Sequence, residues 1–331
     1  MVDAAAPHPG ALPTPGAGSG SGEVTLESGA EGFGAAETQA TVLGIRVQTQ
    51  FGDLRRRFFR NKLAVVGLVM IAIVFLIALV APILASYDPE EVRLTDAQGQ
   101  RLTLLEPSRA HWLGTDDVGR DVLSRLVYGS RIAVVVGIAA IVLALVIGVV
   151  LGSLAGYLGR GWDAVIMRVA DIFFAFPLII GAIVIVLVVG RGLTPVILAL
   201  GIFSWATIAR LLRSSILSVR ESEYVEAARS LGAGKWRIVT RHVLPNSLAP
   251  VLVFAMVSVA TAIVAEASLS FLGVGLQPNV PDWGNMIATG QHYFGFKDYL
   301  WFFPSMAVVF TVLGFVFVGD GLRDALDPRL R

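Results

Sequence analysis

Glu226-Ala227-Ala228-Arg229-Ser230-Leu231-Gly232, followed after nine residues by His242-Val243-Leu244-Pro245, is a charged stretch between two long apolar runs. Charged side chains are costly in a bilayer core, so we expect a sizeable loop on one side of a membrane. Tyr224, Ala227, Ala228 and Leu231 recur at helical spacing. Gly232 then stands where a left-handed turn ends a helix most easily. The stretch therefore predicts a short helix followed by a sharp turn.

A second helical stretch follows the turn. Trp236, Val239 and Val243 share one face of it, and Pro245 marks the return of the chain to the membrane. The pattern alone leaves two interpretations open. The two helices are a docking element for another protein, or they are an amphipathic pair lying on the lipid surface.

The composition indicates a membrane protein that crosses the bilayer several times. The chain has 331 residues, of which 55% are hydrophobic and 15% charged, and its mean hydropathy is +0.72. Soluble domains carry about 25% charged residues. A net charge of +1 gives no reason to expect a nucleic-acid partner. The absence of cysteine excludes disulfides and thiol chemistry.

Residues 1–50 form a separate region, rich in glycine and proline and poor in large apolar side chains. Such a segment cannot bury enough surface to fold, so we expect a disordered cytoplasmic tail. It lacks the basic and apolar regions of a cleaved signal peptide. Residues 51–331 are expected to form the transmembrane domain.

Six apolar runs are long enough to be membrane-spanning helices, which need about 20 residues each. Pro177 predicts a kink within the third. The predicted spans are residues 63–85, 132–154, 172–189, 195–212, 248–272 and 300–318, and the loop described above occupies residues 214–247.

The distribution of arginine and lysine places both ends of the chain in the cytoplasm. Basic residues cluster before the first span, between the second and third, between the fourth and fifth, and after the sixth. The arginines of segment 86–131 oppose this orientation, but acidic residues intersperse them along a long segment. The prediction is an all-helical protein, N-in and C-in, whose 214–247 loop is cytoplasmic.

The loop resembles the EAA loop in the membrane subunits of ATP-binding-cassette (ABC) importers. Glu226-Ala227-Ala228, Gly232 and Leu244-Pro245 match that motif in residue type and spacing, while His242 stands where an aliphatic residue is usual. The resemblance implies a type I ABC importer permease fold. It also implies that Glu226, Ala227, Ala228, Gly232, Leu244 and Pro245 form a coupling helix and its surroundings, gripped by an ATPase subunit.

Further stretches resemble the C-type permease of dipeptide and oligopeptide importers. They are the segments 111–125, 269–275, 283–284 and 319–329. The resemblance covers nearly the whole chain after residue 55. It implies a bacterial inner-membrane permease for peptides, although glutathione and nickel-chelate permeases share these motifs.

The resemblance also implies the partners: a B-type permease, two ATPase subunits, an extracytoplasmic binding protein that delivers the peptide, and the surrounding lipid. The chain itself has no phosphate-binding G-x-x-x-x-G-K-[ST] loop. We therefore expect no cofactor in this chain, with ATP and magnesium bound by the ATPases, and no enzymatic activity or catalytic residue. A self-sufficient secondary transporter is the alternative from another class.

Three acidic residues outside the loop are candidate metal ligands. Asp116, Asp117 and Asp121 lack the spacing of a calcium loop, so we expect no metal site there. A helix starting near Asp117, with an Asp121–Arg125 ion pair at i,i+4, fits the segment better.

Charges inside the spans carry more functional information. Glu266 lies within the fifth span, where an ionisable group lines a translocation path or makes a structural hydrogen bond between packed helices. Both interpretations stay open. Arg168 and Asp171 are spaced as an anchoring ion pair near the cytoplasmic end of the third span.

Overall fold

The computed structural model describes residues 50–93, 95–96 and 99–326, and Phe51–Arg331 belong to one compact unit. The regular secondary structure of the described part is helical, apart from isolated bridges between Thr95 and Arg101 and between Thr115 and Asp121. The predicted all-helical fold is therefore confirmed. The tail predicted for residues 1–50 lies outside the described residues except Gln50, where the first helix begins.

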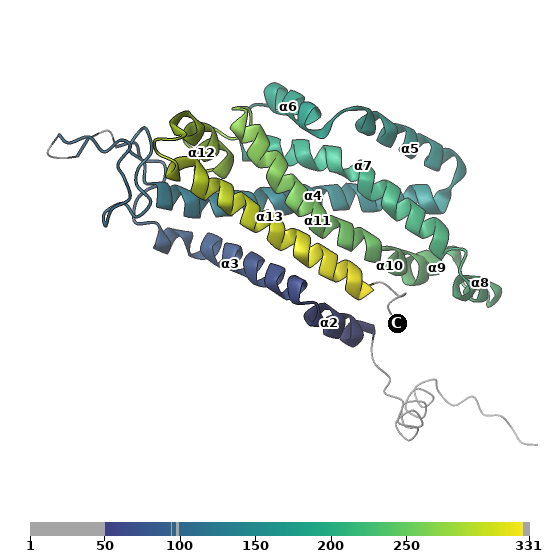
Figure 1. Cartoon of the computed structure of the whole chain (residues 1–331). Helices are drawn as coiled ribbons and strands as arrows, with labels where there is room; N and C mark the ends of the chain where they lie inside the picture. The colour runs from purple at the N-terminus through teal and green to yellow at the C-terminus, as the bar shows by residue number, and fades with distance from the viewer. Residues whose placement is uncertain (1–49, 94, 97–98, 327–331) are drawn as a thin grey trace, which may run out of the picture. The chain divides into compact units, whose positions relative to one another are not determined.

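Five helices are long and apolar enough to cross a membrane. They lie alongside one another in Figure 1 and are α3 (Lys62–Leu84), α4 (Val122–Leu158), α7 (Leu193–Val219), α11 (Ala249–Phe271) and α13 (Tyr299–Leu326). The shorter elements are α2 (Gln50–Arg60), α5 (Arg160–Ala175), α6 (Leu178–Val189), α8 (Glu223–Ser230), α9 (Lys235–Ile238), a π-helical turn (Val239–Val243), α10 (Leu244–Ser247), α12 (Trp283–Gly290) and a 3₁₀ turn (Gln291–Tyr293).

The third predicted span, residues 172–189, is wrong as a single kinked helix. The chain forms α5 and α6 instead, and residues Gly161–Ala175 and Leu178–Val189 meet at an angle of 90°. The residue before a proline is disfavoured in the helical conformation. Phe176 is accordingly extended, with φ −100° and ψ 126°, and Pro177 precedes α6. Pro177 thus breaks the helix completely, and the crossing becomes two half-helices.

Three of the other long helices extend beyond the predicted spans. α4 begins at Val122 rather than residue 132, α7 continues to Val219, and α13 continues to Leu326. Hydropathy reports where lipid contacts end, whereas a helix continues as long as its backbone hydrogen bonds and packing favour it. α3 and α11 coincide with their predicted ranges to within a residue at each end.

Close helix packing depends on small residues at the crossings. A Cβ atom at Gly152 of α4 would lie 2.7 Å from the carbonyl oxygen of Ala209 in α7. A Cβ atom at Gly67 of α3 would lie 2.7 Å from the carbonyl oxygen of Gly314 in α13. Side chains other than hydrogen cannot fit there, so the helices are held at backbone contact, as is common between membrane helices.

Candidate functional site

The predicted coupling segment follows α7 and begins with α8. Ser222, in extended conformation, precedes the helix, and Gly232 follows its end with φ +79°. The N–H of Ala233 donates to the carbonyl of Ala228 at 3.1 Å, and the N–H of Gly232 donates to that of Arg229 at 3.0 Å. These two hydrogen bonds around a left-handed glycine form a Schellman motif, which ends a helix abruptly. The sharp turn predicted at Gly232 is present.

α8 presents its small and acidic residues outward. Glu226 and Ala227 are exposed and Ala228 is half-buried. Leu231 is 89% exposed, whereas Val225 is fully buried against the cluster that contains residues of α7. Sequence reasoning missed Val225, because one valine outside the apolar stripe gives little signal. Val225 attaches the helix to the protein, so the opposite face is free to contact another surface.

The second part of the segment is a helix with a widened turn. The N–H of Leu244 donates to the carbonyl of Val239, five residues earlier. Pro245 has no N–H and its ring would collide with the carbonyl four residues before it, which a π-helical turn relieves. Leu244 is half-buried and Pro245 exposed. These two residues lie where the segment rejoins α11.

The face predicted for Trp236, Val239 and Val243 is only partly formed. Val239 and Val243 are buried, together with Ile238, but the Trp236 side chain is 78% exposed. Tyr224 in α8 is also 47% exposed. In Figure 1, α8, α9 and α10 follow α7 at the end of the long helices away from α12. The segment therefore presents aromatic, aliphatic and acidic groups together beyond the bundle.

A cavity of about 270 Å³ opens beside the break between α5 and α6. Phenylalanines from the break form one side, and hydroxyl side chains of α7 and α11 form the other. The lining residues are Phe173, Phe174, Phe176, Leu178, Leu200, Phe203, Ser204, Thr207, Phe254, Val257, Ser258, Thr261 and Ala262. Ser204 and Ser258 donate to carbonyls of their own helices, at 2.7 and 2.8 Å. Their oxygens therefore remain acceptors. No local sequence pattern pointed to this site.

Glu266 does not line this cavity. It is 2% exposed near the end of α11, and the hydroxyl of Ser270 donates to its Oε1 at 3.0 Å. The carboxyl of Asp282, which precedes α12, is its other polar neighbour. These contacts match the structural interpretation, a hydrogen bond between packed elements. A role on the translocation path stays a prediction.

Asp282 is a second buried carboxyl that sequence reasoning did not single out. Its oxygens accept from the N–H groups of Gly284 at 3.3 Å and Asn285 at 3.0 Å, so it caps α12. It is 1% exposed, and burial raises the pKa of the Asp282 carboxyl above its ordinary value. The pair Glu266 and Asp282 thus joins the end of α11 to the start of α12.

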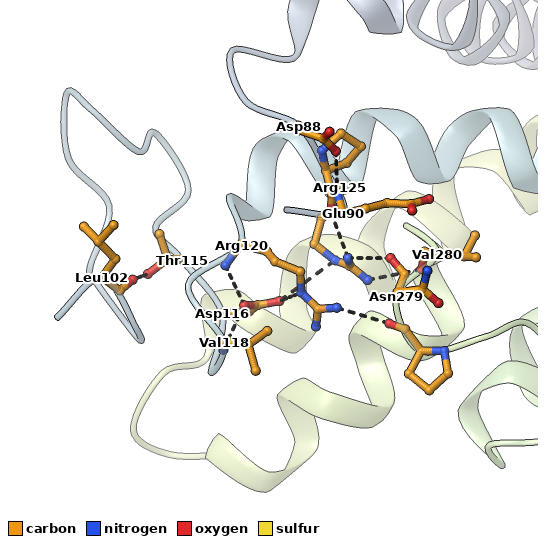
Figure 2. Close-up of polar contacts among 12 residues, drawn as sticks. Asp88, Glu90, Leu102, Thr115, Asp116, Val118, Arg120, Arg125, Asn279 and Val280 are labelled. Carbon is orange, nitrogen blue, oxygen red and sulfur yellow. Dashed lines mark hydrogen bonds and ion pairs between the residues drawn. The ribbon is translucent and has the colours of Figure 1, made fainter. Parts of the chain in front are cut away.

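The acidic cluster before α4 is a structural clamp in the described chain. Asp116 accepts from the side chain of Arg120 at 2.6 Å, while Arg125 donates to the carbonyls of Asn279 at 3.1 Å and Val280 at 3.2 Å (Figure 2). Arg125 also donates to the carbonyl of Pro89 at 2.9 Å. The cluster fixes the segment before α4 against the loop that follows α11.

Two predicted ion pairs are wrong. The helix begins at Val122, not near Asp117, so Asp121 is its N-cap and accepts from the N–H of Ser124 at 2.8 Å. Its other oxygen contacts the imidazole of His111 at 2.9 Å, and Asp116, at 4.0 Å, is the carboxylate near Arg125.

Asp171 pairs with Arg210 of α7 at 2.6 Å instead of Arg168. The break at Pro177 brings α5 alongside α7, so a partner distant in sequence replaces the neighbour three residues away. Across residues 50–326, as far as they are described, no three His, Cys, Asp or Glu side chains are grouped to hold a metal ion.

Comparison with protein families gives two matches along the chain. The family described as "Binding-protein-dependent transport system inner membrane component" matches residues 148–331. The family described as "N-terminal TM domain of oligopeptide transport permease C" matches residues 49–107. The first match contains α8, the turn at Gly232 and α10.

Curated relatives are similar over most of their length. The chain is 42% identical over 286 residues to the glutathione transport system permease protein GsiD of Pectobacterium atrosepticum, covering 86% of this chain and 93% of the relative. It is 43% identical over 272 residues to the dipeptide permease DppC of Alkalihalophilus pseudofirmus, covering 82% and 88%. It is 41% identical over 279 residues to the oligopeptide permease OppC of Bacillus subtilis, covering 84% and 90%.

Among solved structures, the MetNI methionine ABC transporter in inward-facing conformations shares the fold. The TM-score is 0.52 at 22% sequence identity, and the match covers 61% of this chain and 97% of that chain. The predicted importer permease fold is confirmed at this level.

Proposed function

The chain belongs to the family of binding-protein-dependent transport system inner membrane components, and we propose that it takes up dipeptides or oligopeptides as one permease subunit of an ATP-driven importer. It is a multi-pass membrane transport component and not an enzyme. The observation that carries the proposal is the projecting segment from α8 to α10, whose Glu226 and Ala227 face outward while Val225 anchors it.

This segment has the properties that a mechanical connection to an ATPase requires. α8 is short, ends at a left-handed glycine, and is fixed to the bundle through Val225. A displacement of its outer face therefore transfers to α7, which precedes it, and through α10 to α11, which follows it. The small side chains at Ala227 and Ala228 allow a cleft wall to approach closely. We assign Glu226, Ala227, Ala228, Gly232, Leu244 and Pro245 to this coupling.

The partners of the proposed importer follow from the same role. Two ATPase subunits would bind ATP and magnesium, and α8 of this chain would contact one of them. A B-type permease would complete the transmembrane path, and an extracytoplasmic binding protein would deliver the cargo. The similarity to dipeptide and oligopeptide permeases supports peptide as that cargo. The 42% identity to a glutathione permease supports glutathione as the second candidate, and a nickel chelate is a third.

The cavity beside the α5–α6 break supports a passage for amide-containing cargo. Its hydroxyl oxygens on Ser204 and Ser258 can accept hydrogen bonds from peptide N–H groups, and its phenylalanines can contact apolar side chains. This mixture suits cargo of varied sequence. Glu266 is the weaker candidate for the path because its contacts lie outside the cavity lining.

Reconstitution of the four kinds of subunit in vesicles tests the proposal. The variants Glu226→Lys and Gly232→Asp should still insert into the vesicle membrane, together with measurable amounts of the ATPase subunits. They should abolish the peptide uptake that accompanies ATP hydrolysis. Glu221→Lys is the matched control, since Glu221 is also exposed but precedes α8. Uptake at the wild-type rate in Glu226→Lys and Gly232→Asp would contradict the coupling role. Uptake without any ATPase would instead identify a secondary transporter.

Cargo is tested separately with the same vesicles. ATP hydrolysis stimulated by the cognate binding protein should rise with dipeptides or oligopeptides in a ligand panel. Stimulation by glutathione or a nickel chelate, with none by peptides, would overturn the peptide assignment while leaving the coupling role intact.

A further inference from the structure

α2 carries a dense set of arginines immediately before the first long helix. Arg55, Arg56, Arg57 and Arg60 lie in an eleven-residue helix, Gln50–Arg60. The side of α2 that carries Leu54 and Phe58 faces the protein, since both side chains are half-buried. A Cβ atom at Gly321 of α13 would lie 3.5 Å from the ring of Phe58. Packing therefore accounts for one face of α2 and leaves the other to be explained.

The outward face combines cations with an apolar ring. Arg55, Arg56 and Arg60 are exposed, and none of them forms an ion pair with any residue whose side chain the structure describes. Phe59 lies among them and is 55% exposed. An exposed phenyl ring among arginines is typical of a helix that lies at a lipid surface. Arginines that met an acidic region within the described part of the chain would be paired.

The position of α2 explains this combination. Asn61 alone separates Arg60 from α3, and its side chain accepts from the N–H groups of Leu63 at 3.0 Å and Ala64 at 3.2 Å. Asn61 is extended, so α2 ends where the apolar helix begins. Because α3 enters the hydrocarbon within a few residues, the arginines of α2 lie at the depth of the lipid headgroups.

We propose that α2 binds the anionic headgroups of the membrane leaflet at the N-terminal end of α3. Arg55, Arg56 and Arg60 would bind the phosphodiester oxygens, for which guanidinium groups are well suited. Phe59 would enter the boundary between headgroups and acyl chains. The ligand is a lipid with net negative charge, such as phosphatidylglycerol. The site does not depend on which cargo the chain transports.

Bound lipid would act on the contact between α3 and α13. The amide nitrogen of Asn61 donates to Oδ2 of Asp324 at 3.0 Å, which connects the start of α3 to the last turns of α13. Anchoring α2 in the headgroups holds Asn61 in the orientation that makes this bond. Anionic lipid is therefore expected to stabilise this end of the helix pair.

The full-length chain, purified in neutral detergent, tests the proposal by titration with phosphatidylglycerol and counting of bound lipids by native mass spectrometry. R55Q/R56Q/R60Q should weaken phosphatidylglycerol binding roughly tenfold or more, since each basic residue near a lipid surface contributes measurably. R55K/R56K/R60K should retain most of it, because the charge persists. Phosphatidylcholine should bind the wild type and all variants equally, and inorganic phosphate should not compete.

The matched control removes the same charge elsewhere. R101Q/R109Q/R191Q changes three exposed arginines outside α2 and should leave phosphatidylglycerol binding unchanged. If this control weakens binding as much as R55Q/R56Q/R60Q, the effect is net charge and the proposal is wrong. Unchanged affinity in R55Q/R56Q/R60Q would also overturn it. Loss of ATPase subunits from a co-purified complex, at unchanged lipid affinity, would show that α2 docks protein instead.

Should R55Q/R56Q/R60Q fail to fold, salt dependence decides the question in the wild type. Binding to headgroups through exposed guanidinium groups is screened by salt, so phosphatidylglycerol affinity must fall as ionic strength rises. Affinity independent of salt would overturn the proposal.

Discussion

The guanidinium of Arg213 in α7 binds both carboxylate oxygens of Asp163 in α5, with Nη2 to Oδ2 at 2.6 Å. This two-pronged contact connects a half-helix to a long helix across 50 residues of sequence. Asp171 and Arg210 make a second contact between the same helices, 2.6 Å long but more exposed. α5 is thus held to α7 by two ion pairs of different exposure.

Asp163→Asn is expected to lower stability by about 1 kcal/mol, because a partly buried paired arginine loses its charged partner. Asp171→Asn should cost less, since exposed pairs contribute little. Thermal unfolding of both variants in the same detergent measures the difference. An equal or larger loss in Asp171→Asn would show that burial does not set the strength of these contacts.

Gly232→Ala separates backbone conformation from steric space. Gly232 and Gly234 both have open surroundings, with no atom within 4 Å of a Cβ placed there, but only Gly232 has a positive φ, +79°. Alanine at Gly232 should cost about 1 kcal/mol of strain in the turn and loosen α8. Alanine at Gly234 should be nearly neutral. Amide hydrogen exchange in residues 223–231 measures the loosening, and identical exchange in the two variants would refute the strained-turn explanation.

Gly181→Ala should alter the cavity at the helix break. A Cβ atom at Gly181 would lie 2.0 Å from the ring of Phe203, which lines the cavity, so the ring must rotate. We expect a stability cost of about 1–3 kcal/mol, as for other overpacked sites, and slower uptake of bulky cargo. Gly161→Ala in α5 is the control, because nothing lies within 4 Å of its Cβ. Normal uptake in Gly181→Ala would separate the cavity from transport.

Asp282→Asn tests the buried cap of α12 through pH. Burial raises the pKa of Asp282 in the folded state, so the folded protein keeps this proton where the unfolded chain has lost it. The stability that results is present below the ordinary aspartate pKa and is lost as pH rises through the raised value. Asparagine retains the cap but cannot ionise. Unfolding temperatures followed from acid to neutral pH should therefore fall less in Asp282→Asn than in the wild type.

Asp298→Asn is the control of opposite sign. The N–H of Gly295 donates to the Asp298 carboxylate at 2.8 Å and holds its pKa below the usual range. Its contribution to stability is therefore present above the ordinary aspartate pKa and is lost as pH falls through the lowered value. Parallel pH profiles for wild type and Asp282→Asn would show that Asp282 carries no extra proton on folding.

The sequence predicted those features that depend on local pattern. Long apolar runs located α3 and α11, and the residues around Gly232 located α8 and its turn. Pro177 was identified as a disruption, but its size was not, because a kink and a 90° break have the same local signal. A single proline indicates where a helix breaks. The angle between the two halves depends on the residues that pack against each of them.

Long-range polar contacts escaped prediction for a physical reason. The carbonyls of Asn279 and Val280 bind Arg125 from more than 150 residues away, and no spacing rule connects them. The prediction of an Asp121–Arg125 ion pair failed because the helix starts at Val122, so that Asp121 is its N-cap. The cavity lining was also missed, since its residues come from four helices and are ordinary within each.

The length of α6 sets a condition on the surroundings of this chain. Twelve residues of helix measure about 18 Å, while the hydrocarbon layer is about 30 Å thick. The turn at Phe176 and Pro177 interrupts the helical hydrogen bonds of the backbone, and lipid offers no groups that could replace them. Water or another polypeptide must therefore border this half-helix. A single copy of the chain surrounded by lipid alone would leave these backbone groups unpaired, so the geometry of the break calls for a water-filled space or a neighbouring chain at this point.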